Sequence, residues 1–179
     1  MTQVGSVYGE ALYTLAQEED LSRTILEELS VLDQSFRAEP DFIRLLRSPN
    51  LSAQERCNIL DDCFRGKVHE YVLNFLKILT EKGYIRYFSD CCKAYESSFN
   101  HDNGILPVTA ITAVSLSPAQ AQKLTEKLCR ITGKQVKLLN RVDPAVLGGV
   151  RLDYDGKQLD DTVSHRLDAV GCLLKNTVL

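Results

Sequence analysis

The sequence has no tryptophan, one methionine, and only ten glycines and five prolines among its 179 residues. This low glycine and proline content excludes collagen-like and low-complexity chains, and 44% apolar residues are enough to fill a packed core. The length is sufficient for one or two domains, since a domain commonly contains roughly 100–150 residues. With 7% aromatic residues and no glycine-lined cleft, the composition favours a binding role over an enzymatic one.

No segment has the pattern of a signal peptide or of a membrane span. Residues 1–6 contain neither the basic start nor the apolar stretch of a secretory signal. The longest uncharged run, 103–122, is long enough to cross a bilayer, but it includes Pro107, Pro118 and several hydroxyl and amide side chains that are costly in hydrocarbon. We therefore expect a cytosolic protein with reduced cysteines, whose contact with any membrane is indirect.

Acidic residues exceed basic ones, and the two are unevenly distributed. The net charge is −3 and the isoelectric point is about 5.6, which argues against a nucleic-acid partner. Residues 1–103 carry 11 Lys and Arg against 17 Asp and Glu, whereas residues 104–179 carry 10 against 7. The hydrophobic pattern changes at the same place, so we predict a domain boundary between Asn103 and Gly104, where both residue types tolerate positive φ.

The first domain, 1–103, has helical periodicity throughout. Apolar residues recur at three- and four-residue spacing, and Ser52 with Glu55 forms a capping box at one helix start. Gly66 and Gly83 mark two helix ends. The pattern predicts six helices, over residues 4–15, 21–36, 39–47, 52–63, 68–82 and 85–99.

The fifth predicted helix is apolar around most of its circumference, over residues 71–79. A helix of this kind either lies at the centre of a core or presents a second apolar face to a partner. Both interpretations stay open on periodicity alone, although a bundle this small has little interior in which to surround a whole helix.

The second domain, 104–179, mixes strands and helices. β-Branched residues predict strands at 106–114, 136–142 and 149–154, and a tight turn follows at 153–156. Ser117, Pro118 and Gln120 predict the start of a helix that ends at Gly133. A last amphipathic helix is expected from Val163 to Leu174. The predicted fold is mainly α, with an N-terminal six-helix bundle followed by a small α/β domain.

Motifs for catalysis or for metal and cofactor binding are lacking. Gly133-Lys134 is not a phosphate-binding loop, because Leu128 stands where a glycine is needed. The cysteines form no C-x-x-C pair, and the histidines His69, His101 and His165 do not recur at metal-ligand spacing. We therefore expect no catalytic residue, no metal and no cofactor, and buried cysteines that act as small hydrophobic residues.

Five segments together resemble the delta subunit of bacterial F-type ATP synthase, a relative of the mitochondrial oligomycin-sensitivity-conferring protein. The resemblance extends over nearly the whole chain, and its most specific part is an Asp-Pro followed by a Gly-Gly pair that enters a strand. The five segments are 8–16 (YGEALYTLA), 42–49 (FIRLLRSP), 74–83 (NFLKILTEKG), 132–138 (TGKQVKL) and 142–152 (VDPAVLGGVRL).

The resemblance implies a stator subunit, peripheral on the cytoplasmic face of the bacterial cell membrane. In that family the helical bundle sits on the catalytic head of alpha and beta subunits and receives alpha-subunit N-terminal helices, while the C-terminal domain meets the b subunits of the peripheral stalk. For the alpha-subunit helix the resemblance implies Tyr8, Ala11, Leu12, Leu15, Phe75, Ile78 and Leu79, and for the b subunits Leu167, Val170 and Leu174.

Two other functions remain as alternatives. A generic helix-binding adaptor would use the same apolar surfaces with different partners. A cysteine-dependent redox enzyme would need a thiolate of lowered pKa and would lose its function when all six cysteines are replaced.

Overall fold

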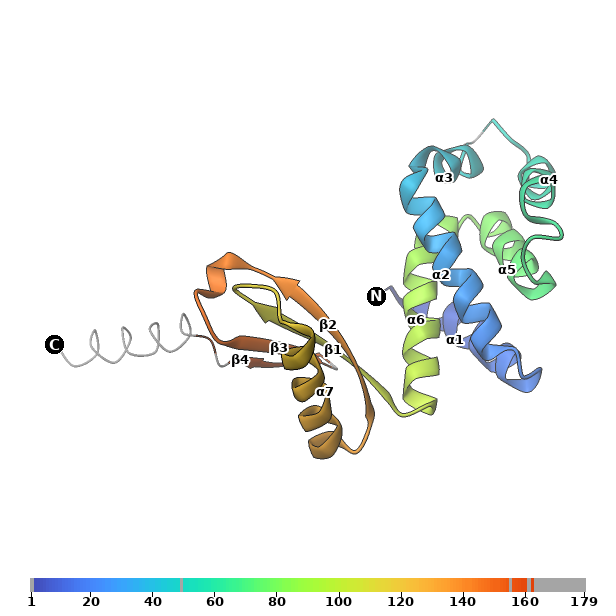
Figure 1. Cartoon of the computed structure of the whole chain (residues 1–179). Helices are drawn as coiled ribbons and strands as arrows, with labels where there is room; N and C mark the ends of the chain where they lie inside the picture. Colours follow the sequence, from blue (N-terminus) through green and yellow to red (C-terminus); the bar gives the residue numbers. More distant parts are fainter. Residues whose placement is uncertain (1, 49, 155, 161, 163–179) are drawn as a thin grey trace, which may run out of the picture. The chain divides into compact units, whose positions relative to one another are not determined.

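The computed structural model describes residues 2–48, 50–154, 156–160 and 162 (Figure 1). The chain divides into two compact units, residues 1–99 and 100–179. The first unit is helical and the second contains a four-stranded sheet with one described α-helix. The predicted fold class, a helical bundle followed by a small α/β domain, is confirmed.

Six α-helices form the N-terminal unit, as predicted, with a short 3₁₀ turn before the last of them (Figure 1). That turn lies where the sequence predicts the first residues of the sixth helix, which therefore starts three residues later. The elements are α1 (Gln3–Glu18), α2 (Ser22–Ala38), α3 (Pro40–Leu46), α4 (Ala53–Phe64), α5 (Glu70–Glu81), η1 (Ile85–Tyr87) and α6 (Phe88–Asp102).

Local hydrogen bonds define several helix starts. At α4 the predicted capping box is present: Ser52 N donates to Glu55 Oε2 at 2.8 Å, and Glu55 N donates to Ser52 Oγ at 3.2 Å. His69 Nδ1 accepts the hydrogen of Tyr71 N at the start of α5. Gly66 and Gly83 follow the two predicted helix ends with φ of +74° and +72°.

Helix α1 packs directly against α6 through two glycines. A Cβ added at Gly5 would lie 2.6 Å from Asp90 Cβ, and one at Gly9 would lie 2.5 Å from the backbone oxygen of Cys91. Thr2 also donates from its N and Oγ1 to Asp90 Oδ2, at 3.0 and 2.8 Å. These contacts hold one side of α1 on α6 and leave the opposite side of the helix to face other elements or solvent.

The C-terminal unit is a two-layer structure. Its sheet has the order β2-β1-β3-β4, with β1 and β2 parallel and the other pairs antiparallel. The elements are β1 (Ile105–Thr112), α7 (Pro118–Thr132), β2 (Gln135–Val142), η2 (Pro144–Val146), β3 (Val150–Tyr154) and β4 (Lys157–Asp160). The three predicted strands and the first predicted helix are present, and β4 extends the turn that the sequence places at 153–156.

Helix α7 covers one face of this sheet. Leu106, Val108 and Ala110 of β1 and Leu152 of β3 form the buried centre, and Leu124 and Leu128 of α7 pack against it. The capping box of Ser117 and Gln120 begins the helix, and Gly133 ends it at φ +67°. The last predicted helix, 163–174, lies outside the described residues.

Candidate partner-binding surface

Residues predicted to bind the alpha-subunit helix divide into a buried and an exposed set. Among the described residues, Leu12 of α1 and Phe75 and Leu79 of α5 belong to the core of the N-terminal unit. Ala11 and Leu15 of α1 and Ile78 of α5 are exposed, and Tyr8 is half-buried. Leu15 and Ile78 are large apolar side chains with exposed fractions of 39% and 45%.

The burial of α5 resolves the two interpretations of its apolar pattern. Six of its residues are buried, which places the helix centrally in the bundle. Ile78 does not share that environment, and Asn74 on the same side of the helix is exposed. The helix therefore supplies core on most of its circumference and one narrow exposed face.

The outer face of α1 is more apolar than the sequence analysis proposed. Val7 is 59% exposed and stands four residues before Ala11, which in turn stands four residues before Leu15. Residues at i, i+4 and i+8 lie along one side of a helix, so these three form an exposed apolar row. Sequence analysis missed Val7, although the same four-residue spacing was there to indicate it.

An aromatic contact joins α1 to the turn that follows α5. The rings of Tyr8 and Tyr84 meet edge to face, with centroids 5.9 Å apart. Tyr84 N donates to Leu79 O at 2.7 Å, so the backbone of Tyr84 is held at the end of α5. We use the name α1–α5 surface for the exposed or half-exposed residues Val7, Tyr8, Ala11, Leu15, Ile78 and Tyr84.

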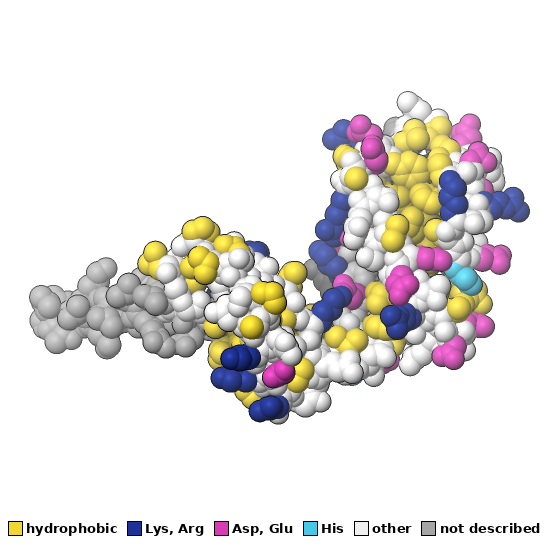
Figure 2. All heavy atoms as spheres, in the orientation of Figure 1, with side chains coloured by type: hydrophobic (Ala, Val, Ile, Leu, Met, Phe, Trp, Pro, Cys, Tyr) yellow, Lys and Arg dark blue, Asp and Glu magenta, His cyan; other side chains and the backbone are white. Residues whose placement is uncertain are grey.

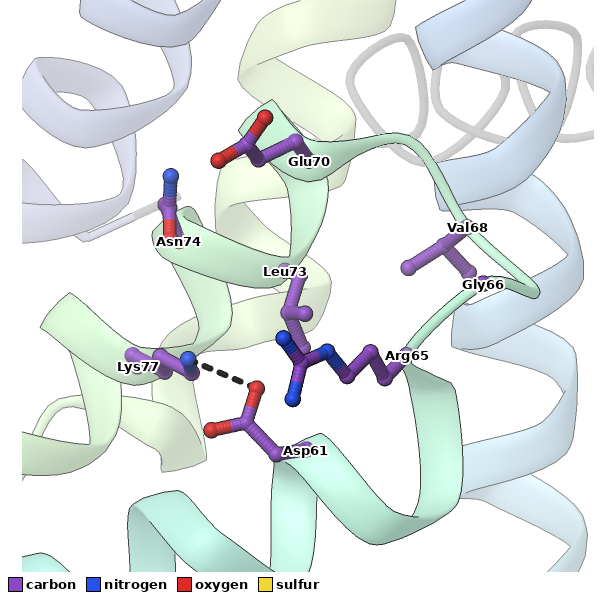
Figure 3. A pocket seen from close by; sticks show the side chains of 8 residues that line it. All are labelled: Asp61, Arg65, Gly66, Val68, Glu70, Leu73, Asn74 and Lys77. Atoms are coloured by element: carbon purple, nitrogen blue, oxygen red, sulfur yellow. Dashed lines mark ion pairs between the residues drawn. The ribbon is translucent and has the colours of Figure 1, made fainter.

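A polar cleft of about 510 Å³ lies between α4 and α5, lined by Asp61, Arg65, Gly66, Val68, Glu70, Leu73, Asn74 and Lys77 (Figure 3). Lys77 Nζ and Asp61 Oδ1 form an ion pair at 2.7 Å. Glu70 lies at the opposite end of the cleft from Asp61, so the two carboxylates do not converge on one point (Figure 3). The lining offers no hydroxyl, thiol or imidazole that could act as a nucleophile.

Burial raises the pKa of three cysteine thiols in the N-terminal unit. It raises the pKa of the Cys91 thiol to about 11 and that of Cys92 still further above its ordinary value. The pKa of Cys57 is also raised, by burial and by the neighbouring Glu81 carboxylate, whose Oε1 lies 3.6 Å from Sγ. A redox thiol requires the opposite shift, so these three cysteines do not support the redox hypothesis.

The described residues contain no group of three or more His, Cys, Asp or Glu side chains placed to hold a metal ion. No described helix is long and apolar enough to cross a membrane. The predicted stalk-binding residues Leu167, Val170 and Leu174 lie outside the described part of the chain.

Comparison with known proteins identifies the family. A model of the ATP synthase delta (OSCP) subunit family matches residues 4–173. The chain belongs to this family. ATP synthase subunit delta of Clostridioides difficile is 34% identical over 92% of both chains, and that of Alkaliphilus oremlandii is 35% identical over 92% of this chain and 91% of its own.

A solved structure supports the same fold. A chain in the mitochondrial ATP synthase of Toxoplasma gondii superposes with a TM-score of 0.78, covering 97% of this chain and 98% of its own, at 18% identity. Membership of the delta (OSCP) family makes the chain a subunit of the ATP synthase peripheral stalk without a catalytic role.

Proposed function

We propose that this chain is the stator element that links the catalytic head of the ATP synthase to its membrane sector. The helical unit binds the head by receiving an alpha-subunit N-terminal helix on the α1–α5 surface, and the C-terminal unit binds the b subunits. The protein is held in this way at the cytoplasmic face of the bacterial cell membrane, as a peripheral component. By preventing the head from turning with the central shaft, it couples rotation to ATP synthesis.

One observation carries the proposal: a small helical unit exposes an apolar row on α1 and an apolar side chain on its central helix. Val7, Leu15 and Ile78 together would gain by leaving water, because a buried apolar side chain contributes about 1.5–3 kcal/mol relative to an exposed one. An amphipathic helix presents apolar side chains at matching three- and four-residue spacing. The buried Leu12, Phe75 and Leu79 support this surface from beneath and do not contact the partner.

A stator needs rigid contact and no chemistry. Contacts through Gly5, Gly9 and Asp90 hold the inner side of α1 against α6, and the outer face of α1 is thereby held in place on the unit. These contacts restrict the movement of α1 within the unit, as a docking surface that carries torque requires.

The test uses the full chain and a peptide with the N-terminal sequence of the alpha subunit from the same organism, titrated in a calorimeter. Leu15→Asp and Ile78→Asp each place a charge on the α1–α5 surface, and we expect binding to weaken by at least about tenfold, since an unpaired charge is costly to bury. Val31→Asp on α2 is the control, because Val31 is also an exposed apolar residue, at 64%, but lies on another helix.

Capture from detergent-solubilised membranes tests the partners independently. Tagged wild-type chain should bring down alpha, beta and b subunits, identified by mass spectrometry. A folded wild-type chain that captures none of them would overturn the proposal in favour of a generic helix-binding adaptor.

A further inference from the structure

Positive charge is concentrated in one part of the C-terminal unit. The segment from Ser117 to Val142, which includes α7 and β2, contains six Lys and Arg but only one acidic residue, Glu126. The whole chain has a net charge of −3, so this segment opposes the overall sign. Figure 2 shows dark blue basic side chains gathered over the region of α7 in the C-terminal unit.

Three of these cations form a row on α7. Lys123, Lys127 and Arg130 recur at i, i+4 and i+7, and all three are exposed. Leu124 and Leu128, which pack on the sheet, lie on the other side of the helix. The row therefore follows the outer face of α7 over about 10 Å, or roughly two helical turns, at 1.5 Å per residue.

The row is not neutralised within the unit. In the described part of the chain, Lys123, Lys127 and Arg130 form no ion pair. Glu126, the one acid nearby, instead accepts a hydrogen bond from Gln122 Nε2 at 3.2 Å. Like charges at i and i+4 destabilise a helix, so an anionic partner that faces the row would relieve the repulsion between Lys123 and Lys127.

An exposed apolar side chain accompanies the row. Ile131 directly follows Arg130 and is 80% exposed, the largest such fraction among the exposed large hydrophobic residues of the described chain. Cations beside an isolated apolar residue form a surface that fits acidic and apolar side chains presented together.

We propose that the outer face of α7, formed by Lys123, Lys127, Arg130 and Ile131, binds an acidic amphipathic helix of a partner protein. The inference rests on the proposed function in one respect, because that function identifies the partner as the peripheral stalk. Carboxylates at i, i+4 and i+7 on the partner would face the three cations over the same two turns.

The first experiment compares two charge-reversal variants in the membrane capture assay. Lys123→Glu/Lys127→Glu/Arg130→Glu removes the row, and Lys67→Glu/Lys93→Glu/Lys157→Glu makes the same change of charge at three exposed lysines elsewhere. We expect the row variant to lose at least about tenfold in captured stalk subunits while it still captures the head, and the control to capture both. Capture of the stalk by the folded row variant at wild-type level would overturn the inference and leave the proposed function standing.

The second experiment does not depend on the identity of the partner. A synthetic helical peptide with glutamates at i, i+4 and i+7 and a neighbouring leucine is titrated into the full chain, beside the same peptide with lysines. We expect only the acidic peptide to bind, with an affinity that falls as salt is added, and the row variant not to bind it. Binding of this peptide by a wild-type chain that captures no stalk would refute the proposed function alone.

Anionic membranes provide the competing outcome. Vesicles of phosphatidylserine and of phosphatidylcholine are sedimented with wild-type chain and with the row variant. Row-dependent binding to phosphatidylserine, without binding to the acidic peptide, would overturn the inference. Circular dichroism and a thermal melt establish that each variant is folded, and Lys123→Gln/Lys127→Gln/Arg130→Gln repeats the test without introducing acids.

Discussion

At the residue scale, the contact of α1 with α6 depends on the missing side chain of Gly9. A Cβ at this position would lie 2.5 Å from the backbone oxygen of Cys91 and 2.7 Å from Ala94 Cβ, so the helices would have to separate. We expect Gly9→Val to lower the free energy of unfolding by about 1–3 kcal/mol, the usual cost of overpacking. Urea denaturation measures it, with Ser30→Ala on the exposed side of α2 as a control that should change little.

Asp90 provides a second prediction at this scale. The hydrogen bonds from Thr2 Oγ1 and N hold the pKa of its carboxyl below the ordinary value of 3.8. A carboxyl whose pKa is lower in the folded state stabilises the fold above its unfolded pKa, and this contribution disappears as the pH falls through the folded pKa. Asp90→Asn should therefore be less stable than wild type at pH 7, and the difference should vanish toward pH 2.

Denaturation of both proteins across this pH range measures the effect. A difference that stays constant down to pH 2 would show that the carboxylate charge is not responsible.

Asp90 also marks a limit of sequence analysis. Its partner Thr2 is 88 positions away, and nothing in either local pattern indicates that they meet.

At the scale of single elements, α5 carries a core residue and a residue of the proposed binding surface close together. Leu76 is fully buried, whereas Ile78 is 45% exposed. We expect Leu76→Ala to lower the free energy of unfolding by about 2–5 kcal/mol, and Ile78→Ala to change it by less than about 1 kcal/mol. Among folded variants, Ile78→Ala should weaken binding of the alpha-subunit peptide more than Leu76→Ala does. Equal destabilisation of the fold by the two substitutions would contradict the assignment of Ile78 to the surface.

Helix existence and helix ends could be predicted from the sequence because they depend on local chemistry. The capping boxes at Ser52 and Ser117 and the glycine ends at Gly66, Gly83 and Gly133 use residues within a few positions of one another. The inside and outside of α5 could not be separated, because apolar residues on both faces give the same periodicity. Only packing distinguishes the buried Phe75 and Leu79 from the exposed Ile78.

At the scale of the whole molecule, the fold class and the family were both predictable, whereas the exposure of individual residues in the proposed docking surfaces was not. Alternation of strand and helix patterns after residue 104 was enough to predict an α/β unit. The four-residue spacing places Val7 on the same side of α1 as Ala11 and Leu15, but it does not show that this side is exposed, and the same holds for Ile131 on α7. Their proposed roles depend on which side of each helix is already packed against the rest of its unit.

The two units have separate cores, and this leads to the last prediction. One buried cluster contains residues of α1, α2 and α5, and the other contains residues of β1 and β3 with α7 packed against them; no residue belongs to both. A substitution in one core removes contacts from that core alone. We therefore expect scanning calorimetry of the full chain to resolve two transitions, with Leu76→Ala lowering the midpoint of one by roughly 8–40 °C, from the cost above and the usual shift of about 4–8 °C per kcal/mol for a domain of this size.

Val108→Ala is the matched variant in the second core, because Val108 is as deeply buried as Leu76 but belongs to β1. It should lower the midpoint of the other transition and leave the first unchanged, since sites without shared contacts act independently. A single transition that both substitutions lower to a similar extent would show that the units unfold together. That result would favour a stator that transmits torque as one rigid body, whereas two independent transitions favour two separately folded clamps on different partners.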